Sequence, residues 1–171
     1  MKRSTINSSI RTARAVCDHF QYESPPYANW SLKEWECAGP EWNEVRDCML
    51  GWDVTDFGSG RFEEIGRALF TLRNGRSIDP RYPKSYAEKL LIDPENQRAP
   101  AHYHRSKRED IMCRHGSNIL AQLTKTGPEG GCSEERFSIQ LNGCARELEG
   151  REIVRLAPGE RDYHLPINPS Q

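Results

Sequence analysis

The stretch RFSIQLNGCARELE, residues 136–149, decides the fold class of this chain. Its apolar residues Phe137, Ile139 and Leu141 occupy alternate positions, and the pair Asn142-Gly143 follows them. Alternation with a period of two residues is typical of a strand with one buried face, and Asn-Gly is a strong turn signal. The stretch therefore predicts two strands joined by a tight turn.

The same pattern extends outward to much of the chain from Gly51 onward. Further strands are predicted in RALFTLRNG (67–75), SYAEKLLID (85–93), NILAQLT (118–124) and EIVRLAPGE (152–160). Asn74-Gly75 predicts a second hairpin turn, and Pro158-Gly159 another turn. Many short strands separated by turns, with no helices between them, predict an antiparallel sandwich or barrel.

The first third of the chain is predicted to be helical. Ser4 is a candidate cap for a helix, and Ser31 with Glu34 matches a capping box for the segment SLKEWECA. Apolar residues recur at helical spacing after Ser4: Ile6, Ile10, Ala13, Val16 and Phe20. We therefore expect an N-terminal helical segment over 1–50 that packs on a β-barrel over 51–171.

Composition excludes several classes of partner. The 171 residues carry 24 Lys and Arg against 25 Asp and Glu, so no bulk charge favours nucleic acid or an anionic membrane. No apolar run approaches the roughly 20 residues of a membrane span. The six cysteines are scattered without a CxxC pair, which favours buried free thiols in a reducing compartment. We expect a cytoplasmic protein.

The stretch AHYHRSKRED, residues 101–110, carries the candidate chemistry. On a strand, His102 and His104 would point to one face and could hold a single ion, and Glu109 could return a carboxylate to it. Two imidazole nitrogens and one carboxylate oxygen suit Mn, Fe, Zn or Ni. The alternative is that the two histidines are surface residues of an exposed strand.

The spacing His102-x-His104-x4-Glu109-x6-Gly116 resembles the first motif of the cupin superfamily, with Asn96 where that motif has a glycine. Further segments resemble one cupin family, the D-lyxose isomerases of bacteria, in the same order along nearly the whole chain. They are MKRSTIN, PPYANWS, GWDVTDFGSG, LFTLRNG, YPKSYAEKLLI, HYHRSKREDI and VRLAPGE.

This resemblance implies a cupin-type jelly-roll barrel and an enzyme that interconverts D-lyxose and D-xylulose, with D-mannose and D-fructose as a further pair. It implies Mn²⁺ as the cofactor, other divalent metals being alternatives, and His102, His104 and Glu109 as its ligands. An enediol route develops negative charge, which cationic side chains can stabilise. Lys89 and Lys107 are the candidates for this catalytic role, and solvated surface lysines are the alternative.

The second cupin motif supplies a fourth ligand, a histidine. Read from Gly159, it places that histidine at Gln171, so we expect a C-terminally truncated chain, an incomplete barrel and little isomerase activity. Two other functions stay open: a sugar isomerase or epimerase of different specificity, and a cupin that only binds metal or sugar. Exposed strand edges and four tryptophans favour a homodimer.

Overall fold

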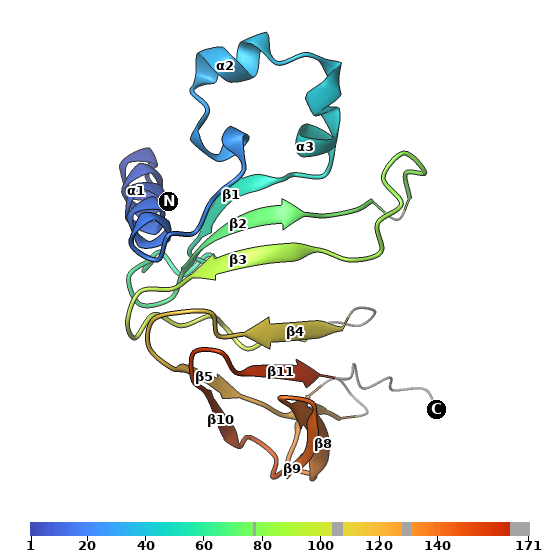
Figure 1. The fold of residues 1–171 in the computed structure, drawn as a ribbon. Helices are drawn as coiled ribbons and strands as arrows, with labels where there is room; N and C mark the ends of the chain where they lie inside the picture. Colours follow the sequence, from blue (N-terminus) through green and yellow to red (C-terminus); the bar gives the residue numbers. More distant parts are fainter. Residues whose placement is uncertain (77, 104–107, 128–130, 165–171) are drawn as a thin grey trace. The chain divides into compact units, whose positions relative to one another are not determined.

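The computed structural model describes residues 1–76, 78–103, 108–127 and 131–164. The chain forms two compact units, Met1–Pro100 and Ala101–Gln171, and each is described by itself (Figure 1). The predicted division into a helical segment over 1–50 and a barrel over 51–171 is a different one and stays a prediction.

The first unit begins with helix α1 (Arg3–His19), which contacts strands β1 and β2. Ala13 and Cys17 are its buried residues, because both lie on the stripe that faces the sheet. The N-cap is Lys2, with no side-chain hydrogen bond, so the prediction that Ser4 caps this helix is wrong. Ser4 lies inside the first turn, since the helix starts one residue earlier.

Four short helical segments follow: η1 (Pro26–Asn29), α2 (Leu32–Cys37), η2 (Pro40–Trp42) and α3 (Asn43–Asp47). The predicted capping box at α2 is confirmed, because the Glu34 carboxylate accepts a hydrogen bond from the Ser31 backbone N–H at 2.6 Å. Trp30 packs edge-on against Trp35 and Trp42, with ring centroids 4.9 and 4.5 Å away. All three indoles are half-buried and form the small aromatic core of these segments.

An antiparallel sheet in the order β1 (Gly51–Thr55), β2 (Arg67–Arg73) and β3 (Glu88–Ile92) completes the first unit. Ala68 and Phe70 of β2 are buried on one face, and Phe70 meets Trp52 edge-on. The prediction of a hairpin turn at Asn74-Gly75 is wrong. Strand β3 begins only at Glu88, and a long loop, residues 74–87, joins β2 to β3. We refer to this segment as the β2–β3 loop.

The described residues of the second unit form eight short strands. They are β4 (Glu109–Met112), β5 (Ile119–Gln122), β6 (Lys125–Thr126), β7 (Cys132–Ser133), β8 (Phe137–Leu141), β9 (Cys144–Leu148), β10 (Ile153–Leu156) and β11 (Arg161–His164). A four-stranded sheet has the order β4-β11-β8-β9, and β10 pairs with β5 and β6 with β7. Ile139, Leu148, Val154, Leu156 and Cys113 form its buried core.

The turn predicted at Asn142-Gly143 joins β8 to β9 and is confirmed. Both residues have positive φ, 51° and 84°, the conformation that a tight two-residue hairpin requires. Leu141 pairs with Cys144 directly across this turn. The stretch that decided the fold class thus forms the hairpin that its pattern predicted.

The predicted fold class, mainly β with N-terminal helices, is confirmed. All ladders between the named strands are antiparallel, as a cupin-like fold requires, and in the described part of the chain they form four separate sheets rather than a closed barrel. All six cysteines are free, but only Cys17, Cys48 and Cys113 are buried, so the expectation of burial is wrong for the other three.

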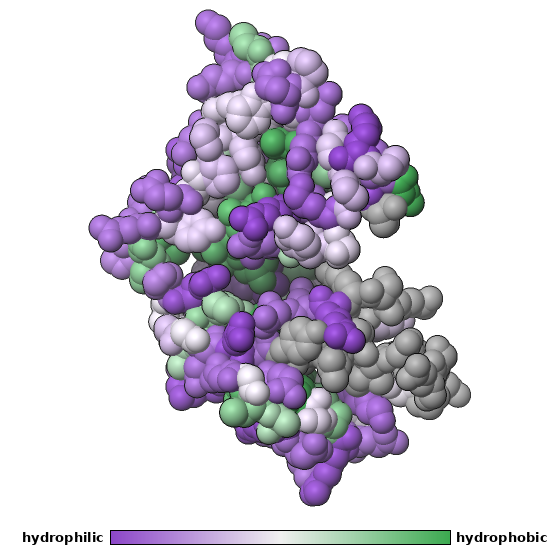
Figure 2. Space-filling view, turned by 45° about the vertical axis from the view of Figure 1, so that its right-hand side comes forward, coloured by the Kyte–Doolittle hydropathy of each residue, from purple (hydrophilic) through white to green (hydrophobic). Residues whose placement is uncertain are grey.

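The face drawn in Figure 2 carries mainly polar side chains among the coloured residues, in keeping with a mean hydropathy of −0.82. Among the described residues there is no helix with both the length and the hydrophobicity that a membrane span requires.

Candidate functional site

Glu109, the predicted carboxylate ligand, opens strand β4 and is half-buried. Successive side chains of a strand point to opposite faces, so Glu109 shares a face with Ile111, and Asp110 lies on the other. Ile111 packs against the core of the second unit. Glu109 therefore lies on the core-facing side of the sheet, which is where a ligand for an ion inside a β-barrel has to lie.

The backbone register of β4 and β11 places His164 opposite Glu109 and Asp162 opposite Ile111. Asp162 also pairs with Leu141 of β8, and its exposed fraction is 0%. Sequence reasoning missed this residue, because most aspartates are exposed and no pattern around Asp162 indicates burial. The buried carboxylate of Asp162 thus lies on the same sheet face as Glu109, on the neighbouring strand β11 and two residues before the position opposite Glu109.

His102 lies outside the strands and is exposed, so the prediction that it belongs to a strand is wrong. Strand β4 starts only at Glu109, so His102 precedes the strand in the chain. His104 and Lys107 lie outside the described residues. Within the described residues no three His, Cys, Asp or Glu side chains form a group that could hold a metal, and one of the three predicted ligands is not among them.

The donor set nevertheless fits a divalent transition metal. Two imidazoles and one carboxylate are ligands that Mn²⁺, Fe²⁺ and Zn²⁺ share. The half-buried, core-facing position of Glu109 is what such a set needs from its carboxylate, because partial exclusion of water strengthens ion binding. Whether the three predicted side chains meet at one point stays a prediction.

Lys89, the first candidate catalytic cation, is the second residue of strand β3 and lies opposite Thr71. It shares a sheet face with Leu69 and Leu91, while the buried Ala68 and its partner Ile92 lie on the other face. Lys89 is exposed, as is Leu91, whereas Thr71 is buried. The lysine therefore stands on the face of the three-stranded sheet that α1 does not cover.

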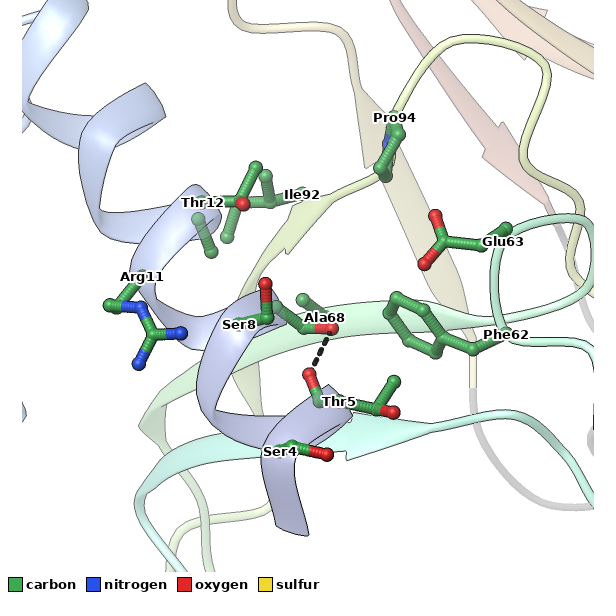
Figure 3. Close-up of a pocket in the computed structure, with 12 residues that line it drawn as sticks. Ser4, Thr5, Ser8, Arg11, Thr12, Phe62, Glu63, Ala68, Ile92 and Pro94 are labelled. Atoms are coloured by element: carbon green, nitrogen blue, oxygen red, sulfur yellow. Dashed lines mark hydrogen bonds between the residues drawn. The ribbon is translucent and has the colours of Figure 1, made fainter. Parts of the chain in front are cut away.

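A hollow in the first unit lies on the opposite face, between α1, the loop before β2 and the end of β3 (Figure 3). It has a volume of about 570 Å³ and is lined mainly by hydroxyl groups of α1, by Phe62 and Glu63, and by Ile92 and Pro94. Lys89 does not line it, because Ile92 and Ala68 belong to the other face of the sheet. This hollow is thus separate from the predicted site.

The β2–β3 loop, which leads into Lys89, is tied to helix α3 by polar contacts. The Tyr82 hydroxyl donates a 2.8 Å hydrogen bond to Asp47, and the Lys84 ammonium pairs with Glu44. The hydrogen bond to Asp47, followed by burial and the negative charge of Asp47, raises the pKa of Tyr82. The hydrogen bond to Glu44 raises the pKa of Lys84. These contacts fix the loop that precedes the catalytic candidate.

Comparison with known proteins shows to which family the chain belongs. The model of the D-lyxose isomerase family matches residues 1–165, a span that includes Lys89, His102, His104, Lys107 and Glu109. The D-lyxose/D-mannose isomerase of Serratia proteamaculans is 38% identical over 161 residues, which cover 94% of this chain and 71% of that protein. The D-lyxose/D-mannose isomerase of Escherichia coli O157:H7 is 37% identical over the same shares. The chain therefore belongs to the D-lyxose isomerase family.

Proposed function

We propose that this chain is a metal-dependent aldose–ketose isomerase that interconverts D-lyxose with D-xylulose and D-mannose with D-fructose. The single observation that carries the proposal is the position of Glu109, half-buried on the core-facing side of β4 within the span that matches the family. The two relatives, whose names give D-lyxose and D-mannose as the sugars that they isomerise, support the choice of sugars.

The metal site is proposed to consist of His102, His104 and Glu109, with Mn²⁺ as the ion. Bound there, a divalent cation would supply electrophilic assistance to the sugar carbonyl and stabilise the negative charge that develops when a neighbouring proton leaves. The ligand set alone does not select Mn²⁺ over related ions, because these ions share imidazole and carboxylate ligands. The choice of Mn²⁺ rests on the family resemblance.

The reaction itself moves two protons and consumes no oxidant or reductant. One proton leaves C2 of the open-chain aldose and returns at C1, and another passes from the C2 hydroxyl to the C1 oxygen, through an enediol. Lys89 and Lys107 are proposed to stabilise the negative charge on the substrate oxygens as this occurs. Fixed cationic groups aimed at developing charge contribute strongly in a site that excludes water.

The test is to incubate the Mn²⁺-loaded protein with D-lyxose, and separately with D-mannose, in D₂O. We expect ketose in which C1 carries deuterium, because the proton held by a catalytic base exchanges with solvent before it returns. Ketose without deuterium would leave the enediol route without support, because a direct hydride shift and a proton transfer shielded from solvent both give this product. Bound metal without ketose from either sugar would refute isomerase activity on these two sugars and leave a sugar isomerase or epimerase of different specificity, or a cupin that only binds metal or sugar.

A matched pair of variants tests the metal ligand. Glu109→Gln removes the core-facing carboxylate, whereas Asp110→Asn removes its exposed neighbour on the opposite face of the same strand. We expect Glu109→Gln to lose tight Mn²⁺ binding in a calorimetric titration and Asp110→Asn to keep it. Equal affinities for the two variants would remove Glu109 from the metal site.

A further inference from the structure

The hollow between α1, the loop before β2 and the end of β3, which we call the α1 hollow, has a volume of about 570 Å³. Pockets that hold small molecules have volumes of roughly 300–1,000 Å³, so the α1 hollow is large enough for such a ligand. All residues that line it belong to the first unit, and none is a proposed metal ligand or catalytic lysine. The chemistry of its lining is therefore independent of the metal site.

The α1 hollow exists because the stripe of α1 toward the sheet consists of small residues. Thr5, Ser9, Ala13 and Cys17 are spaced by four positions, so they lie on one face of the helix. Ala13 and Cys17 are buried, whereas Thr5 and Ser9 are half-buried. A helix that packs on a sheet commonly presents larger apolar side chains at such positions. The first turns of α1 present hydroxyl groups instead, and these groups border the hollow.

The helix side of the α1 hollow is a wall of hydroxyl groups. Five residues of α1 supply it: Ser4, Thr5, Ser8, Ser9 and Thr12. The Ser9 hydroxyl donates a hydrogen bond to the Thr5 carbonyl at 2.9 Å, and the other four hydroxyls form no hydrogen bond with any described residue. A hydroxyl group can both donate and accept hydrogen bonds, so this wall matches a ligand that itself carries several hydroxyl groups.

The opposite side of the α1 hollow is mainly apolar and is held in place. It consists of Phe62, Ala68, Ile92 and Pro94. The Gln97 side chain donates a hydrogen bond to the Phe62 carbonyl at 2.5 Å. The Phe62 ring packs so closely on Gly66 that a Cβ atom at Gly66 would lie 2.6 Å from it. A ring fixed in this way can pack against the C–H groups of a ligand with little further loss of conformational freedom.

The charged groups at the α1 hollow favour a neutral ligand. One carboxylate, Glu63, and one guanidinium, Arg11, lie along it, so its lining has no net charge. Neither group forms an ion pair with another described residue. Figure 3 shows the Glu63 carboxylate and the Phe62 ring turned toward α1. A carboxylate only accepts hydrogen bonds, and charge makes the hydrogen bonds that it accepts from hydroxyl groups stronger.

We propose that the α1 hollow binds a neutral monosaccharide or open-chain polyol, away from the metal site. Such a ligand has hydroxyl groups for the helix wall and for Glu63, and C–H groups for the ring of Phe62. A phosphorylated sugar would bring a negative charge to Glu63, and like charges disfavour binding. An ammonium compound would find one carboxylate and would leave the hydroxyl wall largely unused. The proposal does not depend on isomerase activity, because the hollow shares no residue with the proposed metal site.

The experiment follows the amide chemical shifts of the full chain, without added metal, during a titration with D-lyxose. We expect saturable shift changes in the first turns of α1 and around Phe62. Glu109→Gln, which lacks a proposed metal ligand, should show the same changes with the same affinity. D-sorbitol should bind as well, whereas a hexose phosphate and putrescine should bind more weakly.

Two matched pairs of variants locate the binding site. Ser8→Leu should abolish binding, because the larger side chain fills the hollow, and Asn7→Leu should not, because Asn7 is exposed on α1 and does not line the hollow. Glu63→Gln should weaken binding roughly 3–10-fold through loss of a charged acceptor. Glu64→Gln, an exposed neighbour outside the lining, should keep the affinity of wild type.

Shift changes that grow in proportion to sugar concentration, or that persist in Ser8→Leu, would overturn the proposal, because they would reflect a general solvent effect. Tighter binding of the hexose phosphate or of putrescine would overturn the choice of a neutral sugar. If Ser8→Leu does not fold, the two glutamate variants decide, since both positions are exposed. Loss of the changes in Glu109→Gln would assign the sugar to the metal site and overturn the proposal. The expected changes in a protein without isomerase activity would leave this proposal standing while the proposed function fails.

Discussion

The Tyr82 hydroxyl donates a hydrogen bond to the Asp47 carboxylate at 2.8 Å, although 35 positions separate the two residues in the chain. This contact joins the β2–β3 loop to helix α3. Tyr82 itself is buried, with an exposed fraction of 8%. The loop leads into β3, so the contact helps to fix the strand that carries Lys89.

Tyr82→Phe is expected to lower the thermal midpoint, because it leaves the partly buried Asp47 without this donor. The folded state raises the pKa of Tyr82, so the stabilisation is complete below the ordinary tyrosine pKa and is lost as pH rises through the folded value. We therefore expect the deficit of the variant to shrink between pH 9 and pH 12, followed by circular dichroism. The control is Tyr86→Phe, in the same loop but exposed, which should change neither midpoint nor pH profile.

Gly75→Ala is expected to destabilise the protein through a steric clash. A Cβ atom at this position would lie 1.8 Å from the Lys84 carbonyl oxygen, a backbone atom that cannot move without opening the β2–β3 loop. Overpacking of this kind costs about 1–3 kcal/mol, which urea denaturation would measure. Gly131→Ala, where a Cβ meets no atom of the described residues within 4 Å, should stay within about 0.5 kcal/mol of wild type. Similar values for the two variants would contradict the close approach.

Gly143→Ala tests the hairpin between β8 and β9. No atom of the described part of the chain lies within 4 Å of a Cβ built at Gly143, but its φ of 84° is strained for alanine, so we expect a loss of about 1–2 kcal/mol. Gly143→Asn should lose less, because asparagine tolerates this conformation better. The turn also braces β11, since the Asn142 side chain accepts a hydrogen bond from the Arg161 backbone N–H at 2.9 Å. Equal losses for alanine and asparagine would mean that backbone strain does not decide the effect.

Lys89→Met is expected to reduce kcat about 100-fold, if this cation stabilises developing charge as proposed. The thermal midpoint should hardly change, because the side chain is exposed. The matched control is Lys33→Met on α2, another exposed lysine of the first unit, which should keep full activity. Wild-type kcat in Lys89→Met would assign Lys89 to the solvated surface.

The two Asn-Gly pairs show how far the sequence could predict the fold. Asn142-Gly143 forms the predicted turn because an alternating strand follows it at once. After Asn74-Gly75 the chain carries Pro80 and Pro83, and proline cannot donate a ladder hydrogen bond, so the next strand is delayed to Glu88. The Asn74 side chain instead donates a hydrogen bond to the Cys48 carbonyl at 3.0 Å. This tertiary contact cannot be predicted from the local sequence pattern.

The candidate site was only partly predictable for a similar reason. Ligand-like spacing singled out Glu109, and the structure places it on the core-facing side of β4. Asp162 gave no signal, because its burial follows from how β11 pairs with both β4 and β8. Such pairings join residues far apart in the chain, and a one-dimensional pattern contains no record of them.

Three of the cysteines are exposed and three are buried, so their rates of reaction with a thiol reagent should differ. A thiol reagent should modify Cys37, Cys132 and Cys144 immediately, and the three buried thiols only when their surroundings open. Cys17 and Cys48 belong to the first unit and Cys113 to the second. The slow phases of labelling, assigned by mass spectrometry, would therefore report separately how often each unit opens, without any engineered probe.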